Sequence, residues 1–145
     1  MSQPPMPPGV PQDGRSFPWF AVLLLLLGST GVAAAWVAVS MVTGSQCAWM
    51  SLVAGLDAAW LLRLAGAPRG GLRMAAGVCA AAAAIALAHW GIVSAHLAGM
   101  MGMGFVETAM RLGPSLAWTL SALANTTTDL AMLFLGLVVA AFASR

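Results

Sequence analysis

The sequence contains no lysine and no tyrosine, and only four of its 145 residues are acidic. The six basic residues are all arginines, so charged residues make up 7% of the chain, against roughly 25% in soluble domains. A soluble domain of this size cannot cover its surface with so few charged side chains. The shortage excludes a soluble enzyme, a nucleic-acid-binding domain and a disordered regulator.

Apolar residues fill the chain instead, at 61% of the total. They form four blocks, at about residues 18–42, 47–64, 72–98 and 116–143. A helix needs about 20 mostly apolar residues to cross a hydrocarbon core of about 30 Å, and all blocks but the second exceed that length. None of them alternates apolar and polar residues at period two, as the strands of a membrane barrel do. The sequence therefore predicts an all-α integral membrane protein with four transmembrane helices.

The links between the blocks predict how the helices are arranged. The first two links are short, which favours antiparallel neighbours and an up-down-up-down bundle over residues 18–145. The third link, about 99–115, is longer and places Glu107 and Arg111 four residues apart. It forms either a short interfacial helix or a simple overhang of the preceding helix.

The arginines predict the orientation in the membrane. Only Arg111 belongs to a link on one side; the other five fall on the opposite side, at positions 15, 63, 69, 73 and 145. By the positive-inside rule both termini are then cytoplasmic, with a disordered Pro-rich tail over residues 1–17. The use of arginine without lysine, with much Ala, Gly and Leu, indicates a GC-rich bacterial genome and hence the bacterial inner membrane. The alternative is a secretory signal that is cleaved after the Ala33–Ala35 run.

Two acidic residues lie inside the apolar blocks, where a charge is costly unless it is paired or solvated. Asp57 and Asp129 are both expected near the bilayer midplane. Around Asp129, polar and small residues recur at steps of three and four, which places them on one helix face. We expect this face to point into the bundle or at a partner; it comprises Trp118, Ser121, Asn125, Thr128, Asp129, Met132 and Gly136.

The third block contains His89 and His96, and three interpretations of them stay open. His89 can hydrogen-bond Asp57, Asp129 or Asn125 and so hold helices together. It can instead titrate between the two carboxylates in a proton or cation path. In the third interpretation, His89, His96 and Met100 ligate haem or copper. The first interpretation, in which His89 only connects helices, needs no cofactor.

The remaining motifs predict that the chain is not an enzyme. Cys47 and Cys79 are expected to lie too far apart to form a disulfide, and no Cys-x-x-Cys, Walker A or nucleophile-elbow motif is present. The favoured function is an accessory, assembly or immunity-type subunit that acts through helix contacts in the bilayer, with other membrane subunits or with itself. The alternatives are a small oligomeric proton- or cation-coupled transporter and a haem or copper membrane protein.

Overall fold

A computed structural model describes residues 19–145; in this part of the chain the regular elements are all helices, and there are no strands. Six helices follow one another in the order α1 (Trp19–Thr43), α2 (Met50–Leu64), α3 (Gly71–Met101), α4 (Phe105–Arg111), α5 (Pro114–Ala124) and α6 (Thr127–Ala143). The tail predicted over residues 1–17 lies outside the described residues.

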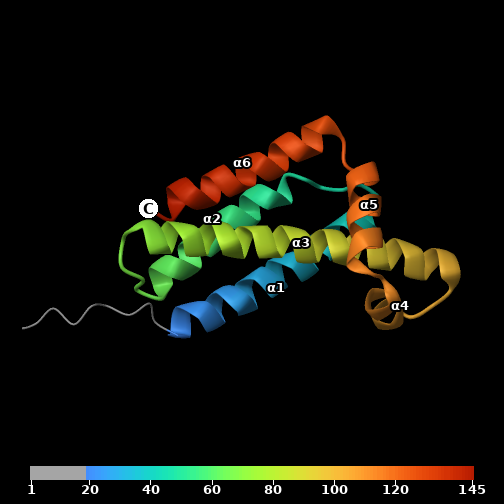
Figure 1. Ribbon diagram of the computed structural model, residues 1–145, viewed down its shortest axis with the longest axis horizontal. Coiled ribbons are helices and arrows are strands. Elements are labelled where there is room, and N and C mark those ends of the chain that lie inside the picture. The colour runs from blue at the N-terminus through green and yellow to red at the C-terminus, as the bar shows by residue number, and fades with distance from the viewer. Residues whose placement is uncertain (1–18) are drawn as a thin grey trace, which may run out of the picture.

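Four helices, α1, α2, α3 and α6, pack along one another, while α4 and α5 lie against the C-terminal part of α3 (Figure 1). The C-terminus lies beside the end of α2 and the start of α3, as an up-down-up-down order requires. A hydrogen bond of 3.3 Å from Arg63 Nη2 to the carbonyl of Ala143 joins the ends of α2 and α6.

Membrane-spanning character is confirmed for two of the four expected spans. Helices α1 and α3 are long and apolar enough to cross a bilayer, with mean hydropathy of 2.2 and 1.8 over their best windows. Helices α5 and α6, with 11 and 17 residues, are each too short to qualify alone, and they make a third candidate only if the pair, bent by 112°, is counted as one span. With 15 residues, α2 is shorter than the roughly 20 that a helix normally needs to span.

Glycines in the left-handed conformation end three of the helices at the predicted links. Gly44 follows α1, Gly66 closes α2 and Gly102 closes α3, each with φ near +65°. At the end of α2 the amide of Ala67 donates to the carbonyl of Leu62, at 3.1 Å, as in a Schellman motif. The left-handed glycine at 102 also separates α4 from α3. The third link thus contains a helix of its own, and the alternative of a simple overhang is wrong.

The predicted helix over 116–143 is interrupted in the structure. Asn125 and Thr126 are extended, so α5 ends at Ala124 and α6 begins at Thr127. Thr126 caps the first turn of α6, and this cap competes with continuation of the helix. The chain therefore turns sharply within a stretch that hydropathy alone marks as a single span.

The core of the bundle consists mainly of small side chains. Trp36 is its largest fully buried residue and packs against Ala33, Ala88 and Ile92. The indole Nε1 donates to the carbonyl of Gln46 at 2.8 Å, which fixes the link between α1 and α2 over the core. A separate cluster of Val93, Leu112 and Ala117, on α3, after α4 and on α5, holds the two short helices in place.

Candidate functional site

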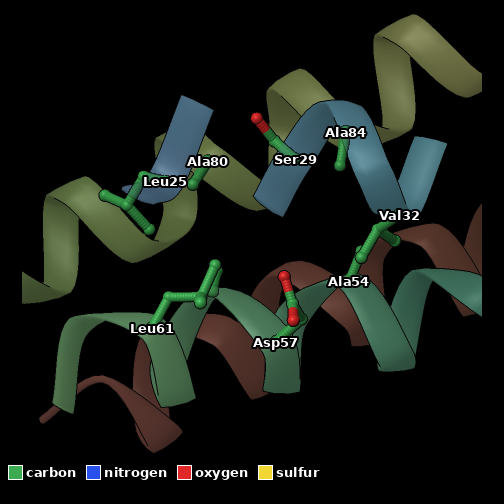
Figure 2. A pocket seen from close by; sticks show the side chains of 9 residues that line it. Leu25, Ser29, Val32, Ala54, Asp57, Leu61, Ala80 and Ala84 are labelled. Atoms are coloured by element: carbon green, nitrogen blue, oxygen red, sulfur yellow. The ribbon is translucent and has the colours of Figure 1, made fainter. Parts of the chain in front are cut away.

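Asp57 lies at the middle of α2 and points toward α1 (Figure 2). The side chain is half-buried, and a methyl group built on Gly28 would stand 3.0 Å from its Oδ2 atom. No basic residue of the described chain pairs with it, and the hydroxyl of Ser29 donates to the Leu26 carbonyl instead. The carboxyl group thus occupies a contact between two helices without a partner of opposite charge.

The pocket beside Asp57 is formed by three helices. Its walls consist mostly of small or aliphatic side chains and leave no space for a water molecule. They are Leu25, Ser29 and Val32 of α1, Ala54, Asp57, Ala58 and Leu61 of α2, and Ala80 and Ala84 of α3. Neither His89 nor Asp129 belongs to this pocket, so the three residues of the predicted ion path do not form one site.

His89 lies on α3. Its buried side chain contacts α1 and the break between α5 and α6. Its Nδ1 atom lies 2.9 Å from the carbonyl oxygen of Ile85, and its Nε2 atom lies 3.4 Å from Oδ1 of Asn125. The ring also meets Trp36 edge-on, with 5.7 Å between the ring centroids. Because a carbonyl can only accept, Nδ1 carries a proton. With that tautomer, Nε2 is an acceptor for the Asn125 side-chain amide in its flipped orientation.

Of the three hydrogen-bond partners expected for His89, the structure supplies Asn125. This contact joins α3 to the end of α5, as the interpretation of His89 as a connection between helices predicts. At 3.4 Å it is long for a hydrogen bond and correspondingly weak.

Asp129 has a different position from the one predicted. It lies in the first turn of α6, not in the middle of a long helix. Its Oδ2 atom accepts from the backbone amide of Thr126 at 2.9 Å and from the Thr126 hydroxyl at 2.7 Å, while the Asp129 amide donates back to that hydroxyl at 3.3 Å. Asp129 therefore completes a capping box and determines where α6 begins.

The polar face predicted around Asp129 is divided by the break between α5 and α6. Gly136 is buried against α2, and Asn125 reaches His89. Trp118 is 78% exposed, and Thr128 is exposed as well. Much of this face is thus left uncovered by the rest of the chain.

The residues proposed for metal or haem ligation do not form a cluster. His89 is buried, whereas His96, two turns further along α3, is exposed and bonds the Ile92 carbonyl through Nδ1 at 2.9 Å. Met100 is 84% exposed. Within residues 19–145 no group of three His, Cys, Asp or Glu side chains is arranged to hold a metal ion.

Cys47 and Cys79 are both free thiols, as expected. Cys47 lies in the link between α1 and α2 with a positive φ of 47°, which is rare for a residue other than glycine. Its sulfur is 3.2 Å from the Ser45 hydroxyl and 3.1 Å from the Thr43 hydroxyl. Hydrogen bonds from these two hydroxyls hold the pKa of the Cys47 thiol below its usual value.

A close backbone contact between α2 and α6 was not predicted. A methyl group on Gly55 would lie 2.5 Å from the carbonyl oxygen of Gly136, and one on Gly136 would lie 2.6 Å from the carbonyl oxygen of Ser51. At the same contact the Ser51 hydroxyl donates to the carbonyl of Met132 at 2.7 Å. The signal was available, because Ser51 and Gly55, like Gly136 and Ala140, show the four-residue spacing of small residues that favours close packing in membranes.

Comparisons with known protein families, with curated proteins and with solved structures found no match to this chain.

Proposed function

We propose that this chain is a four-span protein of the bacterial inner membrane that acts by binding other membrane subunits, or further copies of itself, through its helices. In this role it is an accessory, assembly or immunity-type subunit and not an enzyme. Helices α2 and α6 complete the four spans in this proposal, since α2 packs against α1 and α3, α6 packs against α2 and α3, and both carry large apolar side chains outward. The grouping of Arg63, Arg69 and Arg73 at the end that holds the C-terminus supports cytoplasmic termini.

The observation that carries the proposal is the exposed polar face at the break between α5 and α6. Thr128 and Trp118 lie on this face. Within the described chain the hydroxyl of Thr128 forms no hydrogen bond. Polar side chains on membrane helices associate with other helices, because hydrocarbon offers them no hydrogen-bond partner. A second membrane helix placed along α6 would supply one.

The test is affinity purification from native membranes in mild detergent, with the co-purifying subunits and the oligomeric state compared between variants. We expect Thr128→Leu and Asn125→Leu to reduce the recovered partner several-fold, since interhelical hydrogen bonds contribute about 0.6–2 kcal/mol each. Thr30→Leu is the matched control, because the hydroxyl of this exposed residue already bonds carbonyls of its own helix. Unchanged partners and oligomeric state in both test variants would refute the proposal.

A second candidate, a small proton- or cation-coupled transporter, is favoured by the carboxyl group of Asp57. It lies between two helices, and no basic residue within residues 19–145 pairs with it, as for a group that exchanges a proton or cation. Flux into proteoliposomes that Asp57→Asn abolishes, and that Asp129→Asn leaves unchanged because Asp129 caps a helix, would support this function. Flux no greater than in empty liposomes would exclude it.

A further inference from the structure

Three arginines gather where α2 ends and α3 begins. Arg63 lies in the last turn of α2, Arg69 in the link and Arg73 in the first turn of α3. The three therefore lie at the same end of the bundle, within a stretch of eleven residues. Like charges held together in this way repel each other unless an anion offsets them.

Arg73 is the unusual member of this group because it is buried, with only 5% of its surface exposed. One of its nitrogens, Nη1, donates to the carbonyl of Ala67 at 3.3 Å. The buried Nε–H has no hydrogen-bond partner in residues 19–145. A guanidinium has five N–H donors and is costly to bury without an acceptor for them.

No acidic side chain in the described part of the chain faces this group. Glu107 pairs with Arg111 at 3.0 Å on α4, at the other end of the bundle. Asp129 caps α6, and Asp57 faces α1. The guanidinium of Arg145 lies over the ring of Phe142. The main-chain carboxylate of Arg145 forms no ion pair with the three arginines.

The start of α3 adds to the positive potential. This helix is 31 residues long, and no side chain caps its first turn. The free amides of a helix N-terminus, together with the helix dipole, favour an anion at this position. A buried arginine with an unused Nε–H and the uncapped start of a long helix therefore point to the same kind of ligand.

We propose that Arg73, together with Arg69 and the first turn of α3, binds a phosphate group. The Nε–H and Nη–H donors of one guanidinium suit two oxygens of a phosphate, a bidentate geometry that the compact ammonium of lysine cannot reproduce. At the end of a membrane bundle, an anionic phospholipid headgroup supplies this chemistry from within the bilayer, and free phosphate supplies it from solution.

The experiment measures lipid binding to the purified full-length chain by native mass spectrometry in mild detergent. Phosphatidylglycerol, phosphatidylcholine and inorganic phosphate are added in separate titrations. We expect phosphatidylglycerol to bind at least about tenfold more tightly than phosphatidylcholine, and Arg73→Gln to abolish the difference. Arg111→Gln is the matched control: it removes an exposed arginine at the other end and should leave the difference intact. Binding of inorganic phosphate with the same dependence on Arg73 would assign the site to a soluble phosphate.

Because Arg73 is buried, its replacement can disturb folding, and Arg69→Gln provides the independent test. Arg69 is exposed, so its removal should leave the fold intact while weakening phosphatidylglycerol binding about fivefold, the effect of removing one basic residue near a lipid surface. Arg73→Lys should also bind more weakly, although its charge is kept. Equal binding by Arg69→Gln and Arg111→Gln would overturn the proposal.

Discussion

Replacing Gly136 by alanine should force α2 and α6 apart. The added methyl group would lie 2.6 Å from the Ser51 carbonyl oxygen and 2.7 Å from the carbon of that carbonyl, well inside van der Waals contact. Both obstacles are backbone atoms, so no side-chain rotation relieves the clash and one helix must shift. Overpacking of this kind costs about 1–3 kcal/mol, and a shift that breaks the bond from Ser51 to Met132 adds about 0.6 kcal/mol.

The free energy of unfolding can be measured in mixed micelles with increasing mole fractions of dodecyl sulfate. Tryptophan fluorescence reports the transition, because Trp36 is fully buried in the folded protein. Gly136→Ala should unfold at a clearly lower mole fraction than the unsubstituted chain.

Gly31→Ala is the matched control, because a methyl group at that helical position of α1 would have no atom within 4 Å. It should leave stability unchanged or raise it by up to about 1 kcal/mol, the helix preference of alanine over glycine. Equal unfolding midpoints for the two variants would refute the close contact between α2 and α6.

Three further predictions concern individual hydrogen bonds. Ser51→Ala should lower the free energy of unfolding by about 0.6 kcal/mol in the same assay, and no loss would mean that its bond to α6 is not stabilising. Trp36→Phe, which removes the donor to the Gln46 carbonyl, should cost about 1 kcal/mol or more, and an unaltered midpoint would contradict that role. Ser45→Ala should raise the pKa of the Cys47 thiol, because the hydroxyl stabilises the thiolate. Alkylation by iodoacetamide, in a chain lacking the other cysteine, should then need a higher pH; an unchanged pH profile would argue against the bond.

The parts of the fold that follow from the apolar blocks and from the links between them could be predicted from the sequence. Long apolar runs indicated the helices, and the short links between the blocks indicated where α1 and α2 end. The pair Glu107 and Arg111, four residues apart, made a short helix one of two alternatives for the third link, and in α4 the two side chains form an ion pair at 3.0 Å.

The break between α5 and α6 was missed because hydropathy averages over polar residues inside an apolar block. Thr126 and Asp129 have the spacing of a capping box, a local signal that marks a helix start even within such a block. The same averaging placed Asp129 at mid-helix, where a carboxylate suggests ion transport, and not in a cap.

The sequence predicted individual residues of the candidate site, but it did not predict which of them lie together. The sequence singled out Asp57 and His89, but which side chains face each other depends on helix rotation and on long-range contacts. The rotation of α2 turns Asp57 toward Gly28, and the break after Asn125 brings that residue to His89. Neither relation can be read from spacing along the chain.

The unequal lengths of the helices have a consequence for the surrounding lipid. At 1.5 Å per residue, α1 and α3 are about 37 and 46 Å long, whereas α2 and α6 are about 22 and 25 Å. The two short helices pack side by side, so the hydrophobic mismatch falls on one flank of the molecule. If α2 and α6 span the bilayer as proposed above, lipid there must thin below its usual 30 Å or so, at a cost of fractions of a kcal/mol per ångström, unless a second protein covers the flank. In that arrangement the short pair would favour thin bilayers and assembly through that side.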